Sequence, residues 1–254
     1  MKPLPPPWLA LPGLAGGLDK DGGRAAELLA SGFGSVEFGS VTADPLQGSN
    51  GGVGALVRTL AALGDGPGSA AIGIGLGLPP DIPGEGLAEA WVRGIALAAP
   101  VADYVSLNLS AQANRRFLAE AYREHLAAAF AAAAAVRGRM AGAGRRLWLA
   151  VKMPVGGEGA FPEGARLALA AGCDQVTAVL PGDGPPRLDR LAQFVAWLEG
   201  RGTVVAVGGI RSAADVAAAR NGGAAGVQVH RLFAERGAAC LAALLGDVQP
   251  WTVR

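Results

Sequence analysis

The sequence predicts a single (β/α)8 barrel, an α/β fold also called a TIM barrel, and three observations lead to this prediction. Short apolar runs recur along the 254 residues, each followed by a glycine- or proline-marked loop and a helical pattern. The runs are apolar on both sides, as in a parallel sheet covered by helices. Eight consecutive strand–helix units leave little chain over, which favours the barrel. The competing doubly wound sheet usually has fewer strands and a glycine-rich nucleotide turn after the first.

The elements follow one another in strict alternation. The apolar runs predict strands, in chain order, at Leu11–Ala15, Ser35–Phe38, Ala71–Leu76, Tyr104–Leu109, Leu147–Val151, Gln175–Val179, Val204–Val207 and Gly226–Val229. The helical pattern after each run predicts helices at Arg24–Ala30, Gly54–Leu63, Leu87–Ala98, Arg116–Ala141, Pro162–Ala171, Leu188–Gly200, Ala213–Asn221 and Leu232–Leu245. We expect a proline-rich lead-in over residues 1–10 and one barrel domain over 11–254. The long alanine-rich helix could pack against a second copy of the chain, but an ordinary barrel helix is the favoured interpretation.

Composition narrows the class of protein. Hydrophobic residues make up 51% of the chain and the mean hydropathy is +0.32, which excludes a disordered chain. The net charge of +1 argues against nucleic acid as the main partner, because proteins that grip phosphate backbones are usually more basic. No run of 18 uninterrupted apolar residues indicates a membrane span, and the start lacks the apolar core of a signal peptide. A cytoplasmic protein acting on a small molecule is the expectation.

Cysteine and histidine are too sparse for a metal centre. The two cysteines, Cys173 and Cys240, are far apart and form no CxxC pair. The only histidines are His125 and His230. This excludes a histidine-rich metal site and any mechanism that needs several imidazoles, and it predicts two buried thiols rather than a disulfide.

In this fold the active site lies where the strands end, so the residues just after each apolar run are the candidates. After the first run come Ala15, Gly16 and Gly17, whose small size lets a ring or a phosphate approach the backbone, and then Lys20. A glycine-rich turn with a solvated lysine is an equal alternative. The second and fourth runs are followed by hydroxyl and amide groups, namely Ser40, Thr42, Asn108 and Ser110. A loop-capping role for the asparagine stays open.

Lys152 is the strongest single-residue signal, since a lysine inside an apolar strand is costly to bury without a partner. An inward-facing lysine in a barrel usually meets an anion, a reduced cofactor or a Schiff-base substrate. The seventh and eighth runs end in Gly208-Gly209 and in His230-Arg231. Loops in these two places commonly bind phosphate through backbone N–H groups, and Arg231 would add a charged fork.

Several of these segments resemble dihydroorotate dehydrogenases, most closely the class 2 type. They are 14–22, 31–42, 102–105 with 108–110, Val151-Lys152, and 207–210 with 223–224 and 227–229, and they occur in the family's order over nearly the whole chain. The opening segment is specific, whereas the Gly-Gly-Ile element is shared by many FMN barrels. The resemblance implies a (β/α)8 barrel that holds FMN, oxidises dihydroorotate to orotate and serves pyrimidine biosynthesis. No counterpart of the membrane-associating N-terminal helices of class 2 is expected.

Carried over residue by residue, the resemblance implies a flavin ring near Ala15, Gly16 and Lys20, with further contacts from Ser40, Asn108 and Lys152. Lys152 would stabilise the anionic reduced ring. The FMN phosphate would lie on Gly208-Gly209 and on the backbone of His230-Arg231. Lys20, Asn108 and Ser110 are the candidates for direct roles in catalysis.

The chain differs from the family at the positions expected to bind the substrate and to act as the catalytic base. The position of the family's serine or cysteine base is Ala111. The Asn-Thr pair that binds orotate falls on Leu180-Pro181, and a flavin-contacting asparagine falls on Gly75. The family's substrate loop is reduced to the stretch 48–50. The substrate is therefore expected to differ from dihydroorotate.

Three functions are consistent with these residues. The first is an FMN-dependent oxidoreductase of the dihydroorotate dehydrogenase type with a native or altered substrate. The second is a flavin-free barrel lyase or isomerase that binds a phosphorylated substrate and uses Lys152 or Lys20. The third is a non-catalytic relative that serves as a binding or scaffold subunit. The first is favoured.

Overall fold

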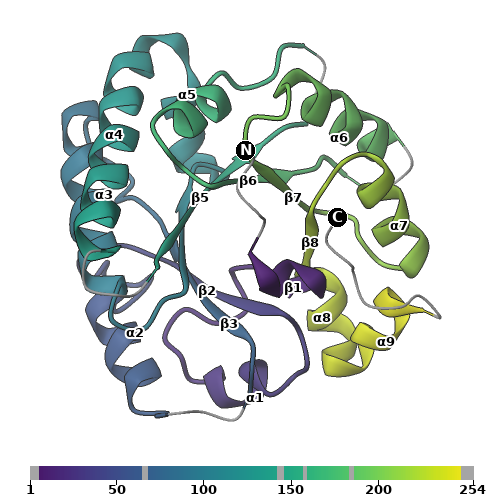
Figure 1. Cartoon of the computed structure of the whole chain (residues 1–254). Helices are drawn as coiled ribbons and strands as arrows, with labels where there is room; N and C mark the ends of the chain where they lie inside the picture. Colours follow the sequence, from purple (N-terminus) through teal and green to yellow (C-terminus); the bar gives the residue numbers. More distant parts are fainter. Residues whose placement is uncertain (1–5, 65–67, 142–145, 157–158, 183–185, 247–254) are drawn as a thin grey trace.

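We analysed a computed structural model of the chain, which describes residues 6–64, 68–141, 146–156, 159–182 and 186–246. Eight parallel strands close into a barrel in sequence order, and the first pairs with the last. The helices form a ring outside the strands (Figure 1), so the predicted (β/α)8 barrel is confirmed. The strands are β1 (Gly13–Leu14), β2 (Ser35–Val41), β3 (Ala71–Leu76), β4 (Tyr104–Asn108), β5 (Trp148–Pro154), β6 (Gln175–Val179), β7 (Thr203–Val207) and β8 (Gly226–Val229).

The helices alternate with these strands as the apolar pattern predicts. They are α1 (Ala25–Leu29), α2 (Gly52–Ala61), α3 (Leu87–Ala98), α4 (Arg123–Ala141), α5 (Gly164–Ala170), α6 (Pro186–Trp197), α7 (Ala213–Asn221), α8 (Arg231–Arg236) and α9 (Cys240–Leu245). Short 3-10 turns precede β1, α3, α4 and α9. The bounds of β3, α3, β6, α7 and β8 equal those expected from the sequence.

Two predicted helices differ from the structure by more than a shift of one to three residues at their ends. The helix expected from Arg116 begins only at Arg123, because Ala119 is extended and separates two 3-10 turns over Gln112–Leu118 and Glu120–Tyr122. The helix expected over Leu232–Leu245 is split into α8 and α9 at Gly237, whose φ of 58° no helix accepts. In both places the apolar pattern continues through a break in the backbone, so periodicity alone does not reveal the break.

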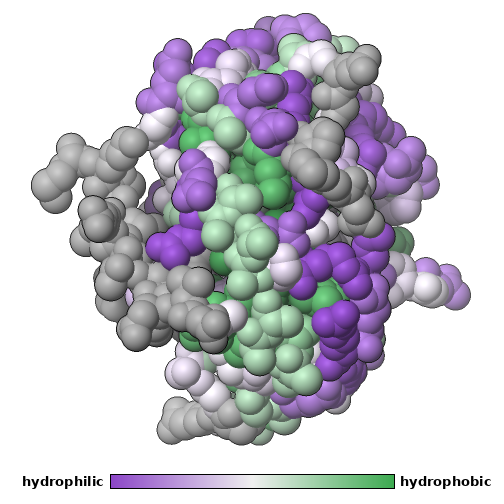
Figure 2. All heavy atoms as spheres, turned by 90° about the vertical axis from the view of Figure 1, so that its right-hand side faces the viewer, coloured by the Kyte–Doolittle hydropathy of each residue, from purple (hydrophilic) through white to green (hydrophobic). Residues whose placement is uncertain are grey.

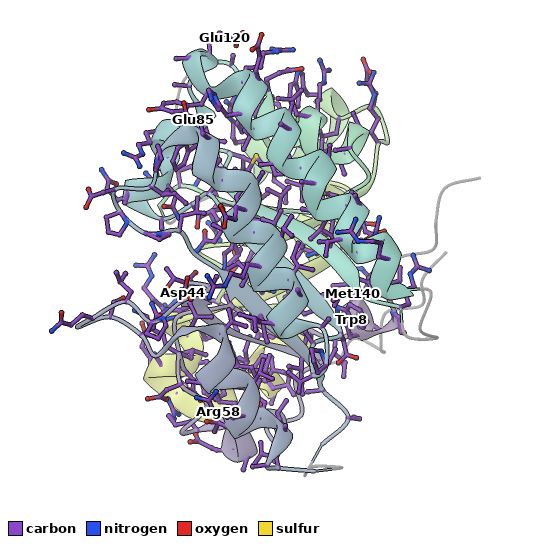
Figure 3. All side chains as sticks on the ribbon, turned by 90° about the vertical axis from the view of Figure 1, so that its left-hand side faces the viewer. Trp8, Asp44, Arg58, Glu85, Glu120 and Met140 are labelled. Carbon is purple, nitrogen blue, oxygen red and sulfur yellow. The ribbon has the colours of Figure 1, made fainter. Side chains whose placement is uncertain are left out.

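The main apolar core lies between the strands and the helices. There the Trp91 ring of α3 stacks on the Phe130 ring of α4, with ring centroids 5.4 Å apart. Both side chains are fully buried. Figure 3 shows α3 and α4 side by side, with Glu85 and Glu120 at one end of the pair and Met140 at the other. The alanine-rich α4 is thus an ordinary barrel helix along the side that packs on α3.

The interior of the barrel is polar. Side chains from strands that are not neighbours meet there, since Lys152 of β5 contacts Glu37 of β2 and Gln228 of β8 contacts Tyr104 of β4. The buried polar residues of the strands are Ser35, Glu37, Ser106, Asn108, Lys152, Gln175, Thr177 and Gln228. Several of these groups hydrogen-bond to one another, although Ser106 Oγ and Gln228 Oε1 have no partner among the described residues, so the interior is a polar layer rather than a second apolar core.

The residues just before β1 cover the base of the barrel, where the strands begin. The 3-10 turn Pro7–Ala10 places Trp8 5.7 Å from the Tyr104 ring, in a stacked arrangement, and edge-on to Trp148. Leu9 is buried and lies against Gly226. Residues 6–10 of the expected lead-in therefore pack on the barrel, and residues 1–5 lie outside the described part of the chain.

Glycine at position 73 is required by the ring of Tyr104, which fills the barrel above it. A Cβ at Gly73 would lie 2.1 Å from Tyr104 Cζ. We expect Gly73→Ala to lower the free energy of unfolding by about 1–3 kcal/mol or more, as overpacking does. Gly138→Ala is the control, because Gly138 is in α4 with nothing near its Cβ position, and it should stabilise by about 0.5–1 kcal/mol. Urea unfolding measures both, and equal effects at the two sites would contradict this packing.

Both cysteines are buried and unpaired by disulfides, as the sequence predicts. Burial raises the pKa of the Cys173 thiol to about 12, so this thiol is inert in the folded protein. In the part of the chain that the structure describes, no three His, Cys, Asp or Glu side chains gather as a metal site would require. Among those same residues no helix has the length and apolarity to cross a membrane.

The face that includes α7 carries a band of mildly apolar residues between hydrophilic ones (Figure 2).

Candidate active site

The centre of the candidate site is a buried ion pair across the barrel. Lys152 Nζ lies 3.1 Å from Glu37 Oε1, and the two side chains are 8% and 1% exposed. The anion that the sequence leads us to expect at Lys152 is thus present within the chain itself. A buried ammonium and a buried carboxylate each require the other, because the loss of hydration is compensated only by a close, hydrogen-bonded partner.

Two glycines make room for the Glu37 carboxylate. A Cβ at Gly16, just after β1, would lie 2.8 Å from Glu37 Oε1, and a Cβ at Gly75, at the end of β3, would lie 3.3 Å from the same atom. Glycine is therefore needed at position 16 because a larger residue would collide with the Glu37 carboxylate, which the sequence alone does not show. The carboxylate lies directly beneath the segment Ala15-Gly16 that lines the mouth of the barrel. At Gly75, the position expected to match an asparagine of the resembling family, a side chain would be in tight contact with the same carboxylate.

A second layer of hydrogen bonds lies under the ion pair. Gln228 Nε2 donates to Glu37 Oε2 at 3.4 Å and lies 3.2 Å from the hydroxyl of Tyr104. Burial, followed by the negative charge of Glu37, raises the pKa of Tyr104 well above its usual value. Tyr104 therefore stays neutral. The layer fixes the Glu37 carboxylate from below, while Lys152 holds it from the side.

Ser40, Asn108 and Ser110 form a connected polar group at the mouth. The Asn108 side-chain amide donates to Ser40 Oγ, and its Oδ1 accepts from Ser110 N at 2.9 Å and from Ser110 Oγ at 2.7 Å. Asn114 Nδ2 donates to the Asn108 carbonyl at 2.9 Å. Asn108 is next to Lys152 in the register of β4 and β5. The structure thus brings four of the predicted site residues together at the mouth of the barrel, namely Ser40, Asn108, Ser110 and Lys152.

One detail differs from the expectation for Ser110. Strand alternation predicts that Ser110 and Ala111 point to opposite sides of the sheet. However, β4 ends at Asn108, so alternation no longer governs Ser110, and its hydroxyl turns back to the Asn108 side chain. Ala111 is exposed and extended. Ser110 is therefore held by Asn108, and Ala111 provides no proton acceptor.

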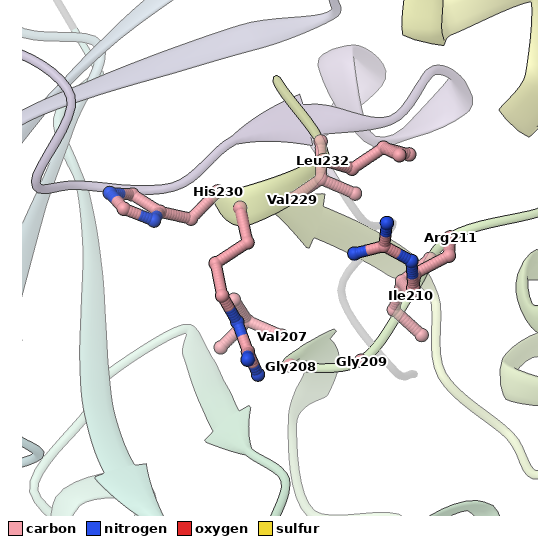
Figure 4. A pocket seen from close by; sticks show the side chains of 9 residues that line it. Val207, Gly208, Gly209, Ile210, Arg211, Val229, His230 and Leu232 are labelled. Carbon is pink, nitrogen blue, oxygen red and sulfur yellow. The ribbon is translucent and has the colours of Figure 1, made fainter. Parts of the chain in front are cut away.

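A pocket lies between the ends of β7 and β8 (Figure 4). It has a volume of about 100 Å³, a few times the roughly 30 Å³ share of a water molecule, and so has room for an anion of phosphate size. Four of the predicted residues are among those that line it, which are Val207, Gly208, Gly209, Ile210, Arg211, Val229, His230, Arg231 and Leu232. Two arginines and two glycines suit an anion, because glycine leaves the backbone N–H groups accessible.

The wall of this pocket at Gly209 is held by a buried arginine. Arg187 Nη2 donates to the Gly209 carbonyl at 2.7 Å and to Asp215 Oδ1 at 2.6 Å. Asp215 in turn accepts from Arg211 N, and Ser212 caps α7 through the Asp215 N–H. A Cβ at Gly209 would meet Arg187 Nε at 2.5 Å. The packing of Arg187 and the φ of 67° at position 209 thus both favour glycine there, whether or not a phosphate is bound.

Lys20 and His230 are placed less directly. The Lys20 side chain is exposed, and the adjacent Asp19 carboxylate accepts the backbone N–H groups of Gly22 and Arg24 at 2.9 Å. Lys20 is thus on an ordered loop but outside the buried network. The His230 imidazole points away from Arg211 in Figure 4 and lies against Gly17, whose Cβ would be 3.0 Å from Nε2. The backbone of His230, more than its ring, belongs to the pocket.

Sequence reasoning missed Glu37 and Arg187. Glu37 lies in the middle of an apolar strand, and a charged residue there is the same signal that identified Lys152. Because Glu37 and Lys152 are opposite charges in two apolar strands of one predicted barrel, the sequence could have suggested that they form an ion pair inside it. Arg187 gives no such signal, since a helical arginine is usually solvated. The contact forms because the loop after β7 places the Gly209 carbonyl next to the start of α6, where Arg187 lies.

No family model matches the chain. In sequence, it is 34% identical over 119 residues to the dihydroorotate dehydrogenase (quinone) of Stenotrophomonas maltophilia strain R551-3, a match that covers 39% of this chain and 33% of the relative. The enzyme of the same name from Thiobacillus denitrificans is 34% identical over 119 residues, with 39% and 34% covered. The match thus spans about a third of the length of these relatives.

The barrel is similar to solved structures over a much larger part. A dihydroorotate dehydrogenase of Eimeria tenella in complex with ferulenol superposes with a TM-score of 0.73 at 20% identity, covering 93% of this chain and 79% of that one. The ligand-free type from the same organism gives 0.75 at 18% identity, covering 99% and 92%. At such identities the likeness shows the fold. The chain is thus similar in sequence to dihydroorotate dehydrogenases over part of its length and similar to them in fold over nearly all of it.

Proposed function

We propose that the chain is an FMN-dependent oxidoreductase that oxidises a small molecule at the mouth of the barrel. The observation that carries the proposal is the combination of a buried ammonium, Lys152, with an anion-sized pocket after β7 and β8. The partial sequence match to enzymes named dihydroorotate dehydrogenase (quinone) supports the same class of reaction. A cytoplasmic location and a link to pyrimidine biosynthesis belong to this proposal.

The residues present fit FMN at both of its ends. The phosphate would be held in the pocket by Arg231 and by the backbone of Gly208-Gly209, and the flavin ring by Lys152, Asn108 and Ser40. The donors suit it chemically, because a reduced flavin ring is anionic and its edge offers both acceptors and donors. Bound FMN would supply the acceptor for a hydride from a substrate carbon.

The chain's own residues have separate tasks in this scheme. Lys152 holds a positive charge beneath the mouth and keeps it there through Glu37. Asn108 is fixed by Ser40, Ser110 and Asn114, so its amide is oriented before any ligand arrives. Such preorganised groups stabilise developing charge without having to reorient during the reaction.

The buried ion pair argues against the lyase alternative. A lysine that forms a Schiff base must first attack as an uncharged amine. For Lys152, forming the uncharged amine requires giving up the ion pair with Glu37, which favours the ammonium. Lys20 is exposed and lacks the desolvated surroundings that activate such lysines. The oxidoreductase is therefore the better-supported function.

Titration of the apoprotein with FMN tests the proposal directly. We expect saturable binding of one FMN per chain, a flavin absorbance spectrum for the complex, and no trapping of phosphorylated aldehydes or ketones on lysine by borohydride. A protein that fails to bind FMN but is modified by borohydride in the presence of such compounds would be a lyase. A protein that does neither would be the non-catalytic relative.

The contribution of Arg231 can be measured separately. Arg231 is exposed and lines the pocket, so we expect Arg231→Ala to weaken FMN binding by about fivefold, corresponding to the roughly 1 kcal/mol of an exposed charge pair. The backbone N–H groups would remain, which keeps the loss modest. Arg236→Ala, at the other end of α8 and outside the residues that line the pocket, is the control and should bind FMN as the parent does. Equal losses in both variants would place the phosphate elsewhere.

A further inference from the structure

The unusual feature of the site is that its cation is already neutralised. Lys152 is the basic residue buried in the strands described here, and Glu37 is its ion-pair partner at 3.1 Å. The glycines at 16 and 75 leave the space that the carboxylate occupies, and Gln228 donates to its other oxygen. The position of Glu37 is thus determined on four sides. A carboxylate so firmly built in is expected to act on whatever charge develops above it.

We propose that Glu37 is a positioning residue that balances the charge of Lys152 beneath the flavin and thereby limits how strongly the site favours reduced over oxidised FMN. This inference rests on the proposed function, because it concerns FMN at the same site. Two charges of opposite sign beneath one ligand oppose each other, since the field at a nearby anion is their sum. Without Glu37, the Lys152 ammonium would act on the reduced flavin anion undiminished.

The alternative role for Glu37 is purely structural. The carboxylate could serve only to hold the lysine side chain in place. The two roles predict opposite outcomes when the Glu37 charge is removed. If Glu37 balances charge, the preference for reduced FMN rises, whereas if it only holds Lys152, the preference falls because the ammonium can turn away.

The experiment measures the dissociation constants of oxidised FMN and of FMN reduced anaerobically with dithionite, in four proteins. They are the unmodified chain, Glu37→Gln, Lys152→Gln and the double variant. We expect the ratio of oxidised to reduced dissociation constants to rise about tenfold in Glu37→Gln and to fall about tenfold in Lys152→Gln. A tenfold change equals about 30 mV for a two-electron couple. The double variant should return close to the ratio of the unmodified chain.

Glu27→Gln is the matched control, because Glu27 also forms an ion pair but on the surface, with Arg24. Its ratio should equal that of the unmodified chain. A ratio in Glu37→Gln at or below that of the unmodified chain overturns the inference and leaves the proposed function standing. If Glu37→Gln does not fold, a double variant with the same ratio as Lys152→Gln overturns it equally well. If the unmodified chain binds no FMN, this inference and the proposed function fail together.

Discussion

Replacing Lys152 by methionine is expected to lower the free energy of unfolding of the apoprotein by about 3–5 kcal/mol, the usual cost of removing one partner of a buried ion pair. Methionine fills a similar volume, so the loss comes from Glu37, which stays buried at 1% exposure without its cation. This loss is a large part of the stability of a typical domain. From sequence alone we would expect the fold to tolerate loss of Lys152, and the buried carboxylate reverses that expectation.

The double variant Glu37→Gln/Lys152→Met identifies the cause. It removes both charges, and we expect it to recover most of the lost stability, since an uncharged pair of similar volume is often as stable as a buried ion pair. Chemical denaturation of the two variants and the parent gives the comparison. A double variant no more stable than Lys152→Met would show that the lysine stabilises the barrel through its methylene packing instead.

Oxidation of dihydroorotate by the unmodified protein is expected to be slower than a general base would allow by about 10²–10⁴-fold, the usual contribution of such a base. Ala111 has no proton acceptor, and the nearest hydroxyl, on Ser110, is bonded to Asn108 Oδ1. Mixing the FMN-loaded protein with dihydroorotate in a stopped-flow instrument and following flavin bleaching measures this. We expect little or no bleaching within the time of a normal turnover.

Ala111→Ser is not expected to restore the reaction. The resemblance implies that the orotate-binding pair of the family falls on Leu180, which is buried among apolar residues, and on Pro181. A serine at 111 would therefore face a substrate that nothing orients. Fast flavin reduction by dihydroorotate in the unmodified protein would contradict both expectations and would assign the base to Ser110 or to Asn114 with a water molecule.

The sequence predicts the fold well because the barrel repeats one simple signal. Each strand is short and carries apolar residues that pack against the helices, each helix follows a loop, and eight repeats leave few other arrangements. The failures occur where the backbone breaks within a continuing pattern. Ala119 and Gly237 interrupt predicted helices, although apolar residues recur on both sides of each break.

The site is predicted in part, for a related reason. Residues at strand ends converge because parallel strands end on one side of a barrel, so Ser40, Asn108 and Lys152 are found together. Partners across the barrel are harder, since Glu37 and Lys152 are 115 positions apart and no local pattern connects them. The space for the Glu37 carboxylate also depends on the missing side chain at Gly16, which a sequence shows only as a flexible residue.

The brevity of β1 has a consequence for how the barrel folds. Gly13 and Leu14 alone pair with both β2 and β8, and so they join the two ends of the chain. Pairing residues so distant in sequence costs more chain entropy than pairing neighbours, so this seam is expected to close last. Before this seam closes, β1 and β8 would each leave an unpaired edge on an open sheet. Trp8, which packs on Tyr104 and Trp148, and Leu9, which packs on Gly226, would then stabilise the closed barrel.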